Sequence, residues 1–239
     1  MAGLARGKLI YGDASGDPAA LAVGSADEVL THDGTDFGWA AAAGGGASVL
    51  GDLTDVSMDI TNFPDGLLIQ PNSDGSAPTT GTLSTAIENI GIGHGAFSAL
   101  TSGDYNTAVG SRAGTALTTG SENQLFGKGA GNGITTGQYN HIFGMNAGGG
   151  FDTESHNVAF GLSALGSTIA GGEYNTAIGN FAGDAITSAD KNTCVGYDTG
   201  TAIADGDENT CLGYITGQTL TSGKRNVFVG NGGNYCTTG

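Results

Sequence analysis

The sequence predicts an all-β protein: a parallel β-solenoid of 17-residue coils that follows a short-stranded N-terminal region. Three observations predict it: 46 glycines in 239 residues, only 13% charged residues, and a strict repeat through residues 89–239. Abundant Gly, Thr, Ser and Asn disfavour a helical bundle. Only four prolines and no glycine at every third residue exclude collagen, and 38% hydrophobic residues disfavour a disordered chain.

An asparagine recurs along the C-terminal part of the chain in steps of 17 residues, with one step of 18 between Asn157 and Asn175. We number each coil from this residue, which is position 0. A glycine stands at position +4 and a large apolar residue at +3 in every coil. The asparagines are Asn89, Asn106, Asn123, Asn140, Asn157, Asn175, Asn192, Asn209 and Asn226, and the glycines are Gly93, Gly110, Gly127, Gly144, Gly161, Gly179, Gly196, Gly213 and Gly230.

A unit of this length is too short for a helical repeat of roughly 33 residues but sufficient for one solenoid coil. We expect two strands per coil, one from the asparagine to the glycine and one around an apolar residue at +11, joined by glycine-bearing corners. The +11 residues are Leu100, Leu117, Ile134, Phe151, Ile186, Ile203 and Leu220, with Ile169 one place late. Stacked asparagines predict a side-chain amide ladder with a structural role. The extra residue of the long coil is placed in or before the turn at 171–172.

The chain is predicted to contain three regions: 1–43, 44–88 and the solenoid 89–239. Apolar runs at 8–11, 20–23, 28–31 and 37–40 predict short strands in the first region. Residues 44–46 (GGG) predict a flexible joint, and 64–66 and 71–75 predict turns between further short strands.

The predicted strands carry apolar residues on both sides. Position +2 is apolar or small and +3 is large and apolar, yet neighbouring strand residues face opposite sides. One set therefore fills the coil and the other faces outward, where it predicts a partner surface. We expect a homotrimer of parallel rods; the alternative is a monomer with this stripe at a corner.

The repeats 106–110 (NTAVG) with 117–120 (LTTG), and 175–179 (NTAIG) with 182–183 (AG), resemble the left-handed β-roll of trimeric autotransporter adhesin heads. They are still more similar to repeats of phage tail fibres, including those with a C-terminal endosialidase-type chaperone. Segments 7–11 (GKLIY), 20–24 (ALAVG), 28–31 (EVLT) and 50–56 (LGDLTDV) resemble elements of virion fibre proteins. The chain departs from these families in having no signal peptide, membrane anchor or chaperone sequence.

The resemblance implies a structural tail fibre that attaches to the virion through residues 1–43 and projects a trimeric solenoid toward a host glycan or protein. The alternatives are a capsid- or neck-attached fibre, a tailspike-like polysaccharide depolymerase, and an ice-binding solenoid. Synthesis in the host cytoplasm and location in the virion are expected. The net charge of −16 argues against nucleic acid as a partner, and no apolar run reaches the roughly 20 residues of a membrane span.

We expect no enzymatic activity and no catalytic, cofactor-binding or metal site. Cys194 and Cys211 occupy equivalent places in adjacent coils and are predicted to be buried free thiols, and Cys236 is also predicted to be free. His32, His94, His141 and His156 share no metal-ligand spacing. Asp205, Asp207 and Glu208 are interpreted as solvated turn carboxylates, with calcium as the alternative. Glu122, Glu154 and Glu173 are interpreted as solubilising edge charges. A threonine ladder of Thr107, Thr176, Thr193 and Thr210 is interrupted by Gln124, His141 and Val158.

Overall fold

The computed structural model describes residues 10–12, 18–20, 28–32, 37–41, 56–57, 66–70, 80, 84–167 and 171–232. The chain divides into two compact units, Met1–Asp52 and Leu53–Gly239. In the first unit, β1 (Ile10–Gly12) pairs antiparallel with β2 (Pro18–Ala20), and β3 (Glu28–His32) pairs antiparallel with β4 (Phe37–Ala41). Short strands are therefore confirmed there, although β2 begins before the predicted run. The predicted joint at 44–46 and turn at 71–75 lie outside the described residues.

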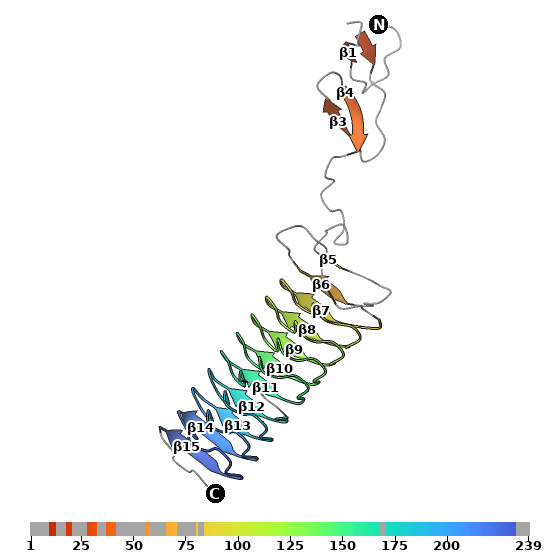
Figure 1. Cartoon of the computed structure of the whole chain (residues 1–239). Helices are drawn as coiled ribbons and strands as arrows, with labels where there is room; N and C mark the ends of the chain where they lie inside the picture. Colours follow the sequence, from red (N-terminus) through yellow and green to blue (C-terminus); the bar gives the residue numbers. More distant parts are fainter. Residues whose placement is uncertain are drawn as a thin grey trace. The chain divides into compact units, whose positions relative to one another are not determined.

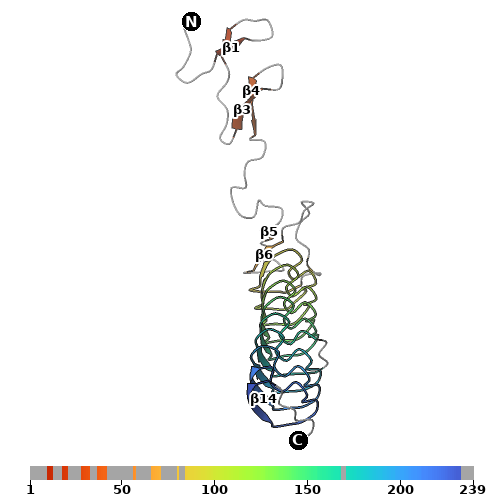
Figure 2. The ribbon, with the colours of Figure 1, turned by 90° about the vertical axis from the view of Figure 1, so that its left-hand side faces the viewer.

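The second unit contains one sheet of eleven strands in the order β15 to β5 (Figure 1). Strands β6 to β15 pair in parallel, and β5 is antiparallel to β6. The strands are β5 (Val56–Ser57), β6 (Leu67–Ile69), β7 (Ile90–Ile92), β8 (Thr107–Val109), β9 (Gln124–Phe126), β10 (His141–Phe143), β11 (Val158–Phe160), β12 (Thr176–Ile178), β13 (Thr193–Val195), β14 (Thr210–Tyr214) and β15 (Val227–Asn231). The predicted parallel β-solenoid is confirmed, and a view turned by 90° shows the same stack of coils (Figure 2).

The sheet begins before the expected first coil at residue 89. Leu68 of β6 pairs with Gly91 of β7, and β5 extends the sheet by one further strand. From β7 onward each strand starts one residue after the repeat asparagine, so neighbours pair with partners 17 residues away, as Thr107 does with Gln124.

The predicted second strand around position +11 is wrong for the described coils, where that segment consists of turns and bends. The reason is visible in its hydrogen bonds. The N–H groups of Thr101, Ser102 and Gly103 all converge on the carbonyl of Thr118 in the next coil, at 3.0, 3.1 and 3.2 Å. Three consecutive donors can share one acceptor only where the chain turns, whereas a parallel strand distributes its bonds along the partner.

The core is a narrow column inside the coils. The side chain at +2 points inward, as Leu125 and Ile142 do, and it packs with an alanine at +7 and the large residue at +11. In β7 the +2 residue is Gly91, and the buried ring of Phe97 occupies the space that a Cβ there would take. A missing side chain on the strand is thus filled from a neighbouring position of the same coil.

The glycine at +4 is required by conformation and by space. Its φ lies between 131° and 149° in all nine coils, a region that L side chains rarely adopt. At Gly144 an added Cβ would lie 2.1 Å from the carbonyl oxygen of Gly161 in the next coil. Both constraints follow from coils stacked at strand spacing, so the glycine column marks the fold.

The extra residue of the long coil lies between Leu165 and Gly172. Leu165 donates to the carbonyl of Ala182, the bond that Gly148 makes to Ala164 one coil earlier. Beyond this point the offset changes: Asn157 Nδ2 reaches the carbonyl of Gly172, 15 residues on, where the equivalent bonds span 14. The predicted position of the insertion is confirmed, while Ile169 lies outside the described residues.

Candidate interaction surfaces

The repeat asparagines form a continuous hydrogen-bonded column inside the solenoid. Asn123 donates from its backbone N–H and from Nδ2 to Oδ1 of Asn106, both at 3.0 Å. Its Nδ2 also donates to the carbonyl of Gly137 in the following coil at 2.9 Å. Asn157 and Asn175 keep the backbone bond to the preceding asparagine where the long coil interrupts the regular spacing. Each side chain therefore ties neighbouring coils together.

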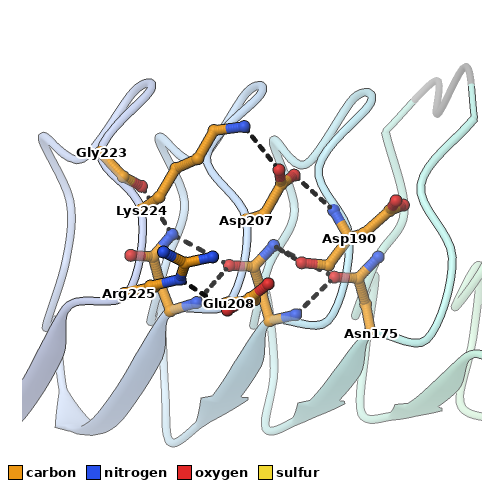
Figure 3. Close-up of polar contacts among 9 residues, drawn as sticks. Asn175, Asp190, Asp207, Glu208, Gly223, Lys224 and Arg225 are labelled. Atoms are coloured by element: carbon orange, nitrogen blue, oxygen red, sulfur yellow. Dashed lines mark hydrogen bonds and ion pairs between the residues drawn. The ribbon is translucent and has the colours of Figure 1, made fainter.

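A second ladder runs along position −2, at the turn. Side-chain oxygens there accept the backbone N–H of the residue one coil earlier, as Asp104 does from Ile87 at 2.9 Å and Ser121 from Asp104 at 3.0 Å. Figure 3 shows its C-terminal end, where Asp207 accepts from the N–H of Asp190 at 3.1 Å. Short polar side chains at −2 thus fix the axial register of the turns.

The carboxylates near the C-terminal turns are paired along the solenoid (Figure 3). Asp207 Oδ2 lies 2.7 Å from Lys224 Nζ, and Glu208 Oε2 lies 2.9 Å from Arg225 Nε. These partners lower the pKa of both carboxyl groups, chiefly through the side-chain hydrogen bonds from Lys224 and Arg225. Their roles as axial ties go beyond the predicted solvated carboxylates. Among the described residues, no group of three or more His, Cys, Asp or Glu side chains is placed to hold a metal ion.

Glu154 is not the solubilising edge charge that was expected, because it is only 4% exposed. Its carboxylate accepts the N–H groups of Asp152 and Thr153 at 2.6 and 3.0 Å, and that of Gly171 at 2.8 Å. In regular coils the equivalents of the first two donors bond to a carbonyl of the next coil. Glu154 thus supplies acceptors beside the insertion of the long coil. Glu122, by contrast, is exposed as expected.

One face of the solenoid is apolar and unpartnered. We call positions +1 and +3 of strands β7 to β15 the sheet face; their side chains point away from the core, as the alternating burial shows. Phe126, Phe143 and Phe160 stack at its centre, with ring centroids 4.8 and 5.4 Å apart. The +3 members are Ile92, Val109, Phe126, Phe143, Phe160, Ile178, Val195, Leu212 and Val229, and the +1 members are Ile90, Thr107, Gln124, His141, Val158, Thr176, Thr193, Thr210 and Val227. The outward apolar stripe predicted from the sequence is confirmed.

Two columns border this face. The upstream rim is position −1: Glu88, Tyr105, Glu122, Tyr139, His156, Tyr174, Lys191, Glu208 and Arg225, all exposed. The downstream rim is position +5: His94, Ser111, Lys128, Met145, Leu162, Asn180, Tyr197, Tyr214 and Asn231. All thirteen large apolar side chains that are exposed among the described residues lie on the sheet face or on one of these rims. Exposed apolar surface is therefore confined to one side of each coil.

The upstream rim was missed by sequence reasoning. Every residue there has a left-handed φ between 53° and 63°, a conformation that usually favours glycine, yet none is glycine. The long side chains instead contact one another between coils: His156 stacks between Tyr139 and Tyr174, at 4.8 and 4.7 Å. The Glu122 carboxylate accepts the Tyr139 hydroxyl and raises the pKa of that phenol. The recurrence of long planar or charged side chains before each asparagine was the available signal.

The two cysteines of the described coils are buried free thiols, as predicted. Cys194 and Cys211 are register partners on β13 and β14. Contact with the Cys211 thiol, followed by burial, raises the pKa of Cys194. A residue with this environment behaves as a small core side chain, not as a nucleophile. Cys236 and the side chain of His32 lie outside the described residues.

Comparisons of the chain with protein-family models, with curated proteins and with solved structures found no match. Among the described residues, none of the secondary structure is a helix long and apolar enough to cross a membrane.

Proposed function

We propose that this chain is a structural fibre protein of a bacteriophage virion, with a left-handed solenoid. In this proposal residues 1–43 attach it to the particle, as part of a tail fibre, and the solenoid projects toward a glycan or protein of the host surface. A capsid- or neck-attached fibre is the closest alternative. The repeat motifs at 106–110 and 175–179 and the N-terminal segments support the assignment through their resemblance to fibre proteins.

The observation that carries a fibre role is the unpartnered apolar sheet face along a stack of coils tied by hydrogen bonds. Ten parallel strands at about 4.8 Å make a rod on the order of 40 Å long. A continuous apolar face of this length favours burial between copies. We propose a homotrimer of parallel rods. The chain's acidic balance supports a role without nucleic acid.

We propose no catalytic role. The described carboxylates of the turns serve in hydrogen bonds and ion pairs between coils, as Asp207, Glu208 and Glu154 do. Glycoside hydrolysis needs two acids roughly 5–9 Å apart flanking a bound sugar. A depolymerase would release reducing ends from host capsule, and we expect none.

Immunoelectron microscopy of purified virions tests the function. An antibody raised against the whole chain, followed by a gold-labelled secondary antibody, should mark a tail fibre; label on the capsid or neck would support the alternative attachment. Absence of the chain from purified particles would refute the virion role. Light scattering of the purified chain should return three times the chain mass, and a single-chain mass would refute the trimer.

A further inference from the structure

The sheet face and downstream rim are almost free of charge in a chain with a net charge of −16. None of their residues is Asp or Glu, and the single Lys or Arg is Lys128. Lys128 is exposed and makes no ion pair in the described part of the solenoid. Acidic surfaces of identical copies repel, so an apolar face without carboxylates is the side on which copies can approach.

The size of this surface also fits a second copy. The face with its two rims spans six residues across the strand, about 20 Å, and ten strands along the axis, on the order of 40 Å. The resulting area, on the order of 800 Å², is what each partner contributes to a standard stable interface. The Phe126, Phe143 and Phe160 stack gives it an aromatic centre, the usual anchor of such interfaces.

Closed symmetry decides which rims meet. In a ring of three parallel rods whose sheet faces turn toward the axis, each upstream rim abuts the downstream rim of the next copy. A pure rotation leaves no axial shift, so position −1 of a coil meets +5 of the same coil in the neighbour. Glu122 then faces Lys128 of the next copy, the one exposed cation of the downstream rim.

Other levels agree with this register. Tyr139 faces Met145, an aromatic–sulfur pair, and Lys191 faces Tyr197, a cation–π pair; all four side chains are exposed in the single chain. No level brings two like charges together. A shift by one coil would place Glu122 opposite Met145 or Ser111 and leave Lys128 without its acid.

We propose that copies of this chain assemble in parallel and in register, upstream rim to downstream rim, with Glu122 of one copy paired to Lys128 of the next. This proposal rests on the proposed trimeric fibre and adds its contact surface and register. Glu122 keeps one carboxylate oxygen for the Tyr139 hydroxyl and offers the other across the interface.

Site-directed crosslinking tests the register in the full chain with Cys236→Ser as background. Glu122→Cys combined with Lys128→Cys should give covalent dimers and trimers on non-reducing gels after mild oxidation. Within one chain these positions lie about 20 Å apart across the strand, too far for a disulfide. The matched control, Glu122→Cys with Met145→Cys, shifts one partner by one coil and should stay at the single-chain mass, as should each single variant.

Charge reversal provides a second test. Glu122→Lys or Lys128→Glu alone should weaken association at least about tenfold, and the double reversal should restore it. If the wild-type chain is trimeric but the Glu122→Cys and Lys128→Cys pair does not crosslink, the rim contact is wrong. Crosslinking of the Met145→Cys control would overturn the register. A monomeric wild-type chain would remove the trimer itself, which is a distinct result.

Discussion

Oδ1 of Asn106 accepts two hydrogen bonds from Asn123, one from the backbone N–H and one from the side-chain amide, both at 3.0 Å. A single buried oxygen thus joins two residues 17 positions apart. The same Asn123 side chain binds the carbonyl of Gly137 in the next coil, so one residue holds three levels of the solenoid. Such fully satisfied buried polar groups stabilise one register and penalise every other.

Replacing an interior ladder residue should therefore destabilise the solenoid. We expect Asn123→Ala to lower the free energy of unfolding by about 1–3 kcal/mol, because the Gly137 carbonyl and the Asn106 amide oxygen lose a buried donor. Urea denaturation followed by circular dichroism measures it. Asn226→Ala, at the partly exposed last coil, is the control and should cost less. Equal losses at both positions would contradict the role of burial.

The corner glycines should tolerate alanine according to the space around them. Gly144→Ala combines a φ of 145° with a Cβ 2.1 Å from the Gly161 carbonyl oxygen, so we expect a loss above about 3 kcal/mol or failure to fold. Gly95→Ala has a φ of 69° and a nearest atom at 3.7 Å, and should cost about 1 kcal/mol. Thermal unfolding of both variants separates stacking clash from backbone strain; similar melting temperatures would argue against the clash.

Glu154 should stabilise the long coil specifically. Glu154→Ala removes the acceptor for the N–H groups of Asp152, Thr153 and Gly171, and we expect about 2–3 kcal/mol of destabilisation. Hydrogen exchange should accelerate at those three amides before it does elsewhere. Glu122→Ala, at an exposed rim position, is the control and should leave exchange in this coil unchanged. Uniform acceleration along the whole solenoid would contradict a local role.

The axial ion pairs predict a loss of stability in acid. Hydrogen bonds from Lys224 and Arg225 lower the pKa of Asp207 and Glu208 in the folded state. The unfolded chain therefore binds more protons near pH 4, so these groups stabilise the fold above their ordinary pKa values and less as the pH falls. The free energy of unfolding should decrease from pH 6 to pH 3. Asp207→Asn with Glu208→Gln should reduce that decrease, and an unchanged slope would refute the assignment.

The apolar face should carry self-association without holding the coil together. Phe143→Asp places a charge at the centre of the Phe126, Phe143 and Phe160 stack, so we expect dissociation to single chains with the strand signal in circular dichroism retained. Analytical ultracentrifugation measures the mass. Val158→Asp on the sheet face should act similarly, whereas Asp at Thr119, an exposed turn residue, should leave the mass unchanged. A trimeric Phe143→Asp variant would indicate another interface.

The repeat itself determined the solenoid, the inward and outward faces of its strands, the asparagine column and the position of the extra residue. These follow from local pattern, because a strict period of Asn, apolar residue and Gly allows few backbone paths. Where coils meet, the pattern was insufficient: the +11 segment turned out to be a turn because three N–H groups share one carbonyl.

Only the tertiary structure decided the roles of residues whose environment comes from another coil. Glu154 looks like any turn acid in the sequence, but the insertion beside it leaves backbone donors that its carboxylate accepts. The left-handed column at −1 carries no glycine to reveal it, and its rings meet only because coils stack at strand spacing. Periodicity fixes the path of one coil, whereas contacts between coils depend on distances that a one-dimensional pattern does not contain.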